Sequence, residues 1–429
     1  MKKFLTLGSL AAATTLIPGL RAFVLLVLVQ AAYGSAAAVT LGVSVQLLGI
    51  TLVSVVGLSI TTVFRVKRSK SPESARAVAV DTGSLAFAGA SVVVTVAIVL
   101  GALIPLVLHE IDHVQFLSYW YISILSLVTY VFTAWQTGLL QAKNADSHGF
   151  RITAVTSLAS VVGAFTITQT IESPWQALPL IAFLNFSFDL CALYLRTRSV
   201  RSVWGSTTDG LWNAAIQTFL ANAPATFKKL PGVARATLDG LILMFVFFIA
   251  GLVASWQDAG IGAAVLAVIA FMRTLVLPLK QFGMVAGRLN LTSGDSKPTS
   301  MPRMLGIVTL LLTAGAMILV VLYQLDVFPP GVSALLIALI IAQLALEPIS
   351  GFLFASMKIM VRPDFAMKPL YFISLLFTIP ALLIIGFTGY SSAEAVWAVL
   401  LLARVAFSFS VLVLYRRARL PIRAEQVGR

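Results

Sequence analysis

Apolar runs of about twenty residues recur from one end of this 429-residue chain to the other. An α-helix of about 20 residues is long enough to cross the hydrocarbon core of a bilayer. Of all residues 59% are hydrophobic and only 11% are charged, whereas a soluble domain carries roughly a quarter charged residues. The pattern predicts an all-α integral membrane protein. It excludes a secreted enzyme, a disordered chain and a nucleic-acid reader, in spite of a net charge of +14.

The apolar windows predict twelve transmembrane helices, six in each half of the chain. They lie at about 4–33, 36–64, 77–108, 116–139, 152–171, 176–195, 232–255, 260–286, 304–324, 331–357, 367–388 and 395–415. The first run follows Lys2 and Lys3, as a signal peptide would. Cleavage near Ala22 would leave only eleven apolar residues, too few to cross a bilayer, so we interpret this run as the first helix.

The distribution of Lys and Arg orients these helices. With the amino terminus in the cytoplasm, none of the six outer loops contains a Lys or Arg, whereas the inner loops and the tail are basic. This positive-inside asymmetry predicts that both termini are cytoplasmic. It also accounts for the net charge without a nucleic-acid partner, and it is typical of a bacterial-type inner membrane.

The two sets of six helices predict two lobes and a linker. The expected segments are an N-lobe at 1–195, a cytoplasmic linker at 196–231, a C-lobe at 232–415 and a basic tail at 416–429. Within the linker, Asp209 could cap a helix that lies on the cytoplasmic leaflet. Pro298 lies 226 residues after Pro72, and other short matches between the two halves of the chain have the same offset. This shared offset favours a parallel pseudo-repeat, as in many secondary transporters.

Several short motifs resemble a known family. The turn Tyr33–Ala38 resembles the LG-x-x-ALAA turn between helices one and two of the multidrug and toxic compound extrusion transporters. The loop Lys70–Arg76 is similar to the G-D-x-x-x-A-R inner loop of the same family, and Gly260–Ala264 with Gly294 and Asp295 repeats the scheme. The family belongs to the multidrug/oligosaccharidyl-lipid/polysaccharide flippase superfamily. The resemblance implies a twelve-helix transporter that works by alternating access.

Two further spacings match the cation-coupled branch of this family. Pro231 with Asp239 fits a Pro at the start of helix seven and an acid eight residues later. Glu347 with Lys358 fits an acid in helix ten and a basic residue eleven positions on. The resemblance therefore implies that Asp239 and Glu347 bind the coupling ion. The helix-one Asp of many family members falls near Leu26 here, so a second ion site in the N-lobe is not supported.

Physical arguments on the same two acids agree with the resemblance. Asp239 lies seven residues into its expected helix and Glu347 ten residues from the end of its own, about 10 and 15 Å from the inner face. Isolated charges at such depths are costly and usually serve transport. Pro348 removes one helical hydrogen bond beside Glu347 and frees a carbonyl. The alternative is structural: Asp239 would pair with Lys228 or Lys280, and Glu347 with Arg273.

Basic residues also fall near the middle of predicted helices. Four bases and one further deep acid complete the set of candidate substrate-binding or gating residues: Arg21, Arg273, Lys280, Arg404 and Asp189. Guanidinium groups suit carboxylate and phosphate ligands, so this set favours an anionic or zwitterionic substrate. The alternative is that these charges form ion pairs that fix helix packing.

One motif suggests an enzyme but has the wrong context. His109–His113 reads H-E-x-x-H, the pattern of zinc proteases. It falls in a predicted outer loop, and the only other histidine, His148, lies on the opposite side of the membrane. We therefore expect a solvated turn and no metal site. Without a P-loop or another catalytic pattern, we expect no enzymatic activity and no cofactor besides a coupling proton or sodium ion.

The sequence as a whole favours a secondary active exporter. It would move a small amphipathic molecule out of the cytoplasm, coupled to proton or sodium entry, and would work as a monomer in the bilayer. The alternative within the same superfamily is a flippase for a polyprenyl-diphosphate-linked oligosaccharide. A membrane scaffold or an intramembrane enzyme is a third possibility, and the sequence names neither the substrate nor the ion.

Overall fold

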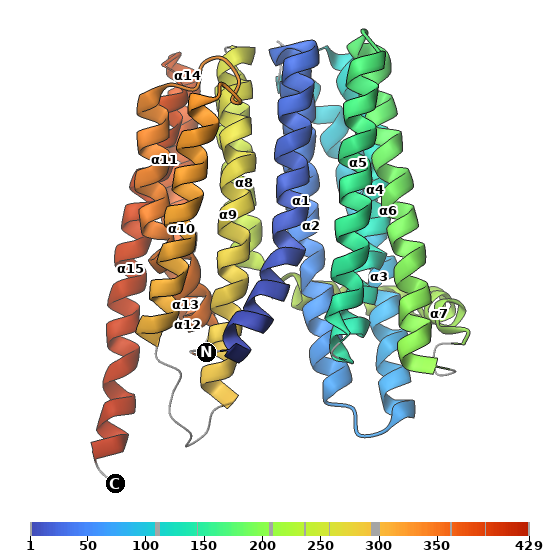
Figure 1. The fold of residues 1–429 in the computed structure, drawn as a ribbon. Helices are drawn as coiled ribbons and strands as arrows, with labels where there is room; N and C mark the ends of the chain where they lie inside the picture. Colours follow the sequence, from blue (N-terminus) through green and yellow to red (C-terminus); the bar gives the residue numbers. More distant parts are fainter. Residues whose placement is uncertain are drawn as a thin grey trace. The chain divides into compact units, whose positions relative to one another are not determined.

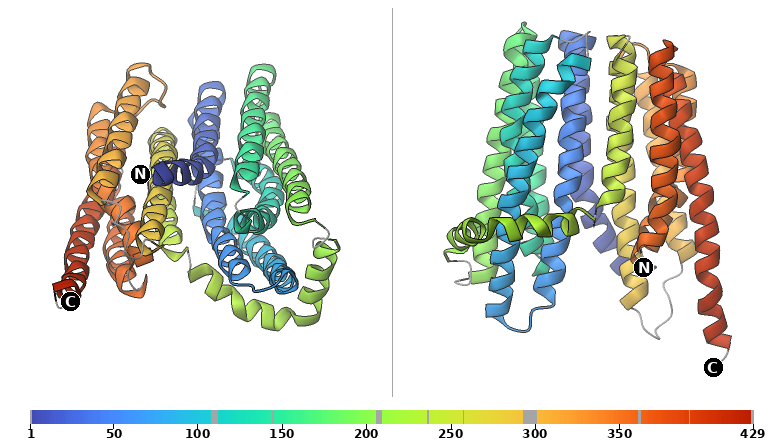
Figure 2. Two further views of the ribbon diagram at one scale, coloured as in Figure 1. Left: turned by 60° about the horizontal axis from the view of Figure 1, so that its bottom comes forward. Right: turned by 180° about the vertical axis from the view of Figure 1, so that it is seen from behind.

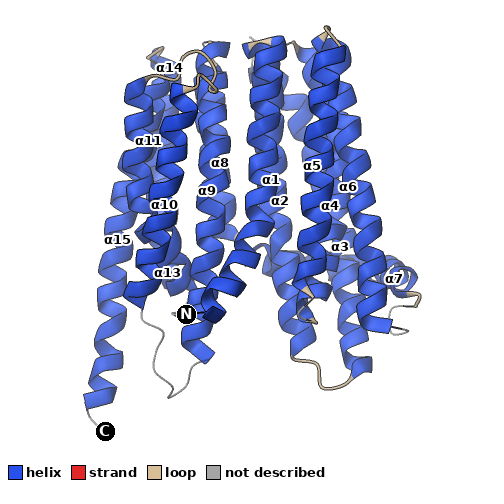
Figure 3. Ribbon diagram, in the orientation of Figure 1, coloured by secondary structure: helices blue, strands red, loops and turns tan. Residues whose placement is uncertain are grey.

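The computed structural model describes nearly the whole chain, and the described part is helical throughout (Figures 1 and 3). The described residues are 2–107, 112–143, 145–205, 209–235, 237–256, 258–292, 301–360, 363–390 and 392–427. Their helices are α1 Lys2–Tyr33, α2 Ser35–Lys67, α3 Pro72–Val107, α4 His113–Ala142, α5 Asp146–Thr170, α6 Pro174–Trp204, α7 Leu211–Arg235, α8 Leu238–Ser255, α9 Ala259–Thr292, α10 Met301–Gln324, α11 Ala334–Glu347, α12 Phe354–Met360, α13 Pro363–Tyr371, α14 Ile379–Thr388 and α15 Ala393–Val427, with π-helices η2 Pro348–Leu353 and η3 Phe372–Thr378. No strand occurs among these residues, which confirms the all-α prediction.

Within the described residues, eleven helices are long and apolar enough to span a membrane. Helix α2, Ser35–Lys67, is 33 residues long and is not among these eleven. A multi-pass membrane protein is therefore supported. The twelfth span and the cytoplasmic position of both termini stay predictions.

Two of the expected helices differ from the observed ones near a proline. The run at 331–357 divides into α11, η2 and α12, with Pro348 at the first break. A proline has no N–H to donate to the carbonyl four residues before it, which allows a wider π turn. The expected helix at 232–255 begins later than predicted, because α7 includes Pro231 and continues to Arg235, and α8 begins at Leu238.

The chain divides into two compact units. One unit contains residues 24–248, and the other contains residues 1–23 together with 249–429. These boundaries fall inside α1 and inside α8, whereas the predicted lobes began at residues 1 and 232. The predicted linker at 196–231 is occupied by the end of α6 and by most of α7.

In the unit of residues 24–248, α4 packs against α2, α3, α5 and α6. Trp135 of α4 is fully buried and donates a hydrogen bond from its indole N–H to the carbonyl of Ala79. α7 runs across the other helices of this unit and packs against α3 (Figure 2). Its Trp212 lies 5.0 Å from Phe132 and 5.1 Å from Trp135, measured between ring centroids.

The predicted interfacial helix is thus partly anchored by protein. Leu211 and Ala215 are buried, while Ile216 and Leu220 on the same helix are exposed. A position on the cytoplasmic leaflet stays a prediction for this exposed edge. Asp209, expected as the cap, forms an ion pair with Arg201 at 3.3 Å.

In the unit of residues 1–23 and 249–429, α9 supplies the core. Its residues 263–273 are buried one after another, as expected for a helix that is apolar all round and enclosed by others. The start of α1 packs here, with Phe4 5.6 Å from Phe282 and 6.5 Å from Phe352 between ring centroids. α11 and α15 are neighbours in the same unit (Figure 1).

Candidate ion-coupling site

Glu347 is the last residue of α11, and its side chain is fully buried. Arg404 of α15 donates to both carboxylate oxygens, from Nε to Oε1 at 2.7 Å and from Nη2 to Oε2 at 2.6 Å. The exposed fraction is 0% for the Glu347 side chain and 8% for that of Arg404. This parallel two-bond geometry is the strongest arrangement that the two groups can form.

A π turn and a glycine adjoin the carboxylate of Glu347. The π-helix η2 begins at Pro348, directly after the acid, and most of its residues are buried. A Cβ placed on Gly351 would lie 2.8 Å from Glu347 Oε2. Gly351 therefore leaves room for the carboxylate one turn away, and π-helical turns of this kind are frequent at functional sites.

Arg404 also contacts an aromatic pair. Its guanidinium carbon lies 5.8 Å from the ring centroid of Phe407, within the range of a cation–π contact. Phe407 in turn lies 5.1 Å from Phe354 between ring centroids. The guanidinium is thus held by the carboxylate on α11 and by a ring on its own helix.

The partner of Glu347 differs from the one that the structural alternative named. Arg273 was the expected candidate, and the observed bidentate partner is Arg404, which we had predicted as a substrate-binding or gating charge. Residues 347 and 404 lie 57 positions apart, so only the packing of α15 on α11 brings them together. A role for Arg404 toward substrate stays a prediction.

Asp239, the other predicted ion-binding acid, lies in α8. It occupies the first turn of α8, at the second residue, and is half-buried. The sequence had placed it seven residues inside a helix, whereas it is the second residue of α8, because α8 begins at Leu238. Asp239 belongs to the unit of residues 24–248 and Glu347 to the other, so a shared ion site stays a prediction.

Asp189 lies near a buried base that sequence reasoning missed. Asp189 is buried in α6 and interacts electrostatically with Arg196, two turns further along the same helix. Arg196 is buried as well, and donates to the carbonyl of Gly149 at 3.3 Å and to the hydroxyl of Thr153 at 2.5 Å. The sequence assigned Arg196 to an inner loop because its basic neighbours hid the continuation of the helix.

The remaining predicted bases lie in the unit of residues 1–23 and 249–429. Arg273 is buried in α9, and Lys280, seven residues further on the same helix, is half-buried. Arg21 is half-buried in α1. Each of the three takes part in a polar or electrostatic interaction, and their predicted role toward substrate is untested.

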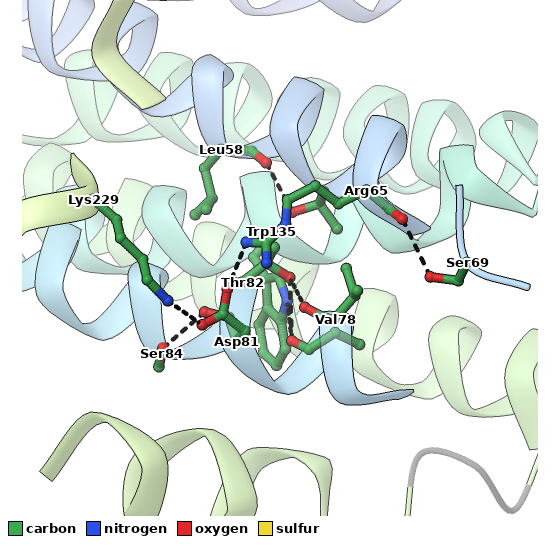
Figure 4. Close-up of polar contacts among 11 residues, drawn as sticks. Leu58, Arg65, Ser69, Val78, Asp81, Thr82, Ser84, Trp135 and Lys229 are labelled. Carbon is green, nitrogen blue, oxygen red and sulfur yellow. Dashed lines mark hydrogen bonds and ion pairs between the residues drawn. The ribbon is translucent and has the colours of Figure 1, made fainter. Parts of the chain in front are cut away.

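A second ion cluster lies within the unit of residues 24–248 (Figure 4). Asp81 of α3 accepts from Arg65 of α2 at 2.5 Å and from Lys229 of α7 at 2.8 Å. All three side chains are partly exposed. We name this group the Asp81 cluster; it connects α7 to the two helices on which it packs.

Of the H-E-x-x-H motif, His109, Glu110 and Ile111 lie outside the described residues. Asp112 caps α4, since its side chain accepts from the backbone N–H groups of Val114 at 3.0 Å and Gln115 at 3.1 Å. Among the described residues no group of three or more His, Cys, Asp or Glu side chains could hold a metal ion.

Comparison of the whole chain with solved structures identifies its fold. An inward-facing multidrug resistance MATE family transporter of the MOP superfamily superposes with a TM-score of 0.75 at 14% identity, covering 99% of this chain and 98% of that one. The chain has the MATE fold. An outward-facing MATE structure gives a TM-score of 0.64 at 13% identity, covering 99% and 96%.

A MOP superfamily transporter from Pyrococcus furiosus has a TM-score of 0.65 at 14% identity, over 97% of this chain and 95% of that one. Its printed description states that reverse polarity of the binding pocket suggests a different function. No family model matches the sequence, and no curated relative matches it. The resemblance inferred from short motifs is therefore confirmed at the level of the fold.

Proposed function

We propose that this chain is a secondary active exporter that moves a small amphipathic molecule out of the cytoplasm by alternating access. Structures with the same fold include an inward-facing and an outward-facing MATE transporter, which supports the proposed cycle. The observation that carries the proposal is the fully buried Glu347, held by Arg404 beside a π turn in a membrane-spanning helix. Intramembrane acids of this kind usually serve ion transport.

Coupling follows from the charge of this pair. A proton or sodium ion that binds Glu347 neutralises the carboxylate and weakens its attraction for the guanidinium. A buried arginine without its counter-charge is costly, so the ion-bound protein favours an arrangement in which Arg404 finds another partner or water. An ion can bias the cycle only because it prefers one state over the other.

The direction of exchange follows from competition between the substrate and Glu347 for Arg404. An anionic group of the substrate would compete with Glu347 for Arg404, and Arg273, Lys280, Arg21 and Asp189 are candidates for the rest of the substrate-binding or gating set. Asp239 is the candidate for a second ion-binding acid. We propose that the protein works as a monomer in a bacterial-type inner membrane. Its mechanism requires a coupling proton or sodium ion and no other cofactor, and it involves no enzymatic reaction.

The experiment is substrate-dependent ion flux in proteoliposomes under imposed proton or sodium gradients. Wild type is compared with Glu347→Gln and with Glu172→Gln, which changes an exposed carboxyl in a loop. We expect Glu347→Gln to reduce gradient-driven flux at least tenfold and Glu172→Gln to leave it unchanged. Equal flux in wild type and Glu347→Gln would remove Glu347 from the coupling site.

The second candidate is a flippase for a polyprenyl-diphosphate-linked oligosaccharide. The burial of Arg273 in α9, with Lys280 two turns away, favours it, because guanidinium and ammonium groups bind diphosphate well. A broad panel of small molecules that produces no flux, together with translocation of a fluorescent polyprenyl-diphosphate sugar between leaflets, would establish this alternative instead.

A further inference from the structure

A cavity of about 260 Å³ lies within the unit of residues 24–248, among α4, the end of α6 and the start of α7. Trp135 and Trp212 line it together with the buried apolar side chains of Leu139, Val200 and Leu211. One water molecule takes up about 30 Å³ in the liquid, so the cavity has room for a group of several heavy atoms. None of the described residues that line it belongs to the proposed ion site or substrate site.

One buried acceptor lines this cavity without a partner. Gln136 is 2% exposed, and its amide nitrogen donates to the hydroxyl of Thr197 at 2.5 Å. The Thr197 hydroxyl itself donates to the carbonyl of Leu193 at 2.9 Å, so its oxygen can only accept from Gln136. Gln136 Oε1 has no hydrogen-bond partner among the described residues. Because an amide oxygen can only accept, a ligand of this cavity has to supply an N–H or O–H group.

The exposed edge of the cavity carries one charge of each sign. Arg201 of α6 donates from Nη2 to Asp209 Oδ1 at 3.3 Å, and the two side chains are 75% and 59% exposed. A guanidinium has five N–H donors, so Arg201 keeps donors for a phosphate beside its bond to Asp209. The lining is neutral as a whole, which favours a zwitterionic ligand over a ligand with a net charge.

An exposed apolar edge of α7 continues from the cavity. Trp212, Ile216 and Leu220 follow one another at intervals of four residues, so they lie on one face of α7. Ile216 is 36% exposed and Leu220 is 71% exposed, and α7 runs across the other helices of its unit (Figure 2). The loop charges assign this end of the helices to the cytoplasmic leaflet. An apolar helix edge at that level suits contact with acyl chains.

We infer that this cavity binds the headgroup of an aminophospholipid, a zwitterionic lipid with a primary ammonium group. The ammonium donates to Gln136 Oε1, the phosphate accepts from Arg201, and the acyl chains follow the apolar edge of α7. Cytoplasmic pockets between membrane helices are common sites for lipid headgroups. Phosphatidylcholine carries the same charges but has no N–H to donate, so it leaves the buried acceptor unsatisfied. The site is independent of ion coupling at Glu347.

The first experiment compares two lipids on the wild-type protein. The full-length protein is delipidated in detergent, and native mass spectrometry measures the binding of phosphatidylethanolamine and phosphatidylcholine with identical acyl chains. We expect phosphatidylethanolamine to bind at least fivefold more tightly, because only its ammonium can donate to Gln136 Oε1. Equal affinities for the two lipids would overturn the inference.

Matched variants test which residues read the headgroup. Gln136→Leu removes the acceptor, and its control is Gln141→Leu on the same helix, where the amide oxygen accepts from Ser59. Arg201→Gln removes the guanidinium, and its control is Arg198→Gln, which removes the same charge from a different groove on α6.

We expect Gln136→Leu to bind both lipids equally and Arg201→Gln to bind both at least threefold more weakly. Both controls should bind like wild type. A preference for phosphatidylethanolamine that survives in Gln136→Leu would contradict the ammonium site. Equal weakening by Arg201→Gln and Arg198→Gln would contradict the phosphate contact.

Photo-crosslinking locates the lipid and separates it from a soluble ligand. A phosphatidylethanolamine with a diazirine in one acyl chain should label α7 at 216–220. Unlabelled phosphatidylethanolamine should displace this label at least fivefold more effectively than phosphatidylcholine. Label at Leu310 on α10, which is 70% exposed, is the control and should respond to both lipids alike. Displacement by soluble phosphoethanolamine at the same concentration would assign the cavity to a free headgroup and overturn the lipid site.

Discussion

At the scale of single residues, Glu347 and Arg404 constrain each other. Both are buried, and two hydrogen bonds join the guanidinium of one to both carboxylate oxygens of the other. Burial of a charge is tolerated only with such a partner. Any substitution of one member therefore acts on both, and a structural cost has to be separated from a functional one.

A double-mutant cycle separates these effects. We expect Glu347→Gln and Arg404→Gln each to lower the free energy of unfolding by about 3–5 kcal/mol, because each leaves the other group without its partner. The double variant should cost clearly less than the sum, since no charge is left uncompensated. Thermal melting of the purified protein in detergent measures this. The control is Asp209→Asn in an exposed ion pair, expected to change stability by less than about 1 kcal/mol. Strictly additive costs at 347 and 404 would contradict the pairing.

Gly351 tests how tightly the carboxylate is seated. Gly351→Ala places a Cβ 2.8 Å from Glu347 Oε2, which forces the carboxylate away from Arg404. We expect destabilisation by about 1–3 kcal/mol and reduced ion-coupled flux. Gly306→Ala on α10 is the control, since nothing lies within 4 Å of its added Cβ. Equal melting temperatures for the two alanine variants would show that the carboxylate has room to move.

Only part of this residue-scale picture could be predicted from the sequence. Glu347 stood out because an acid in an apolar helix is rare, and the pattern of one helix is enough to recognise it. Its partner could not be identified, because Arg21, Arg273 and Arg404 are equally apolar in context and the choice depends on which helices touch. Gly351 could not be recognised from the sequence, since its role is to leave room for the Glu347 carboxylate, which depends on the folded structure.

At the scale of helices, α7 is the element whose attachment is most open to experiment. Its apolar face packs on α3, and its Trp212 contacts Phe132 and Trp135 of α4. The Asp81 cluster fixes its carboxyl-terminal half to α2 and α3. The kink at Asn222, where the backbone leaves helical geometry, separates these two attachments. The carboxyl-terminal half of α7 therefore depends more on charge than on apolar packing.

Removal of the shared acid should loosen that half. We expect Asp81→Asn to increase amide hydrogen exchange at 226–235 severalfold, with a change in global stability of about 1 kcal/mol or less, because the ion pairs are partly exposed. High salt should produce the same change in wild type. Exchange measured by mass spectrometry tests this, and Asp209→Asn is the control. Unchanged exchange at 226–235 would show that packing alone holds this segment.

The sequence predicted the existence of most helices, and it missed the points where they change type. Long apolar runs determine a helix from local composition alone. The start of α8 was misplaced because Pro231 was interpreted as the first residue of a membrane helix, whereas it continues α7. The π turns were not predicted, since their extra residue is accommodated by tertiary packing around η2 and η3.

At the scale of the whole molecule, the fold followed from a few motifs and the count of apolar runs. Identity to the similar solved structures is only 13–14%, and yet they cover nearly the whole chain. The apolar pattern persists where individual residues do not. The division into units could not be predicted, because a sequence pattern does not show that one continuous helix contributes to two units.

The orientation in the membrane is the prediction that belongs to this scale. In a Cys191→Ala background, we expect Gln324→Cys to react with a membrane-impermeant maleimide in intact cells. We expect Ser71→Cys to react only after permeabilisation. Both positions are exposed and lie in or next to loops. Labelling of Ser71→Cys from outside would reverse the orientation and with it the side from which protons enter.

The sharing of α1 between the two units has a consequence for biogenesis. Residues 1–23 are translated before residues 24–248, but they belong to the unit whose other residues, 249–429, are translated after them. At roughly 5–20 residues per second, translation of the intervening segment takes on the order of 10–45 s. During this time the amino-terminal segment waits in the bilayer without its partners. The unit that contains Glu347 can therefore complete its packing only when residues 249–429 meet an amino-terminal segment that was inserted before them.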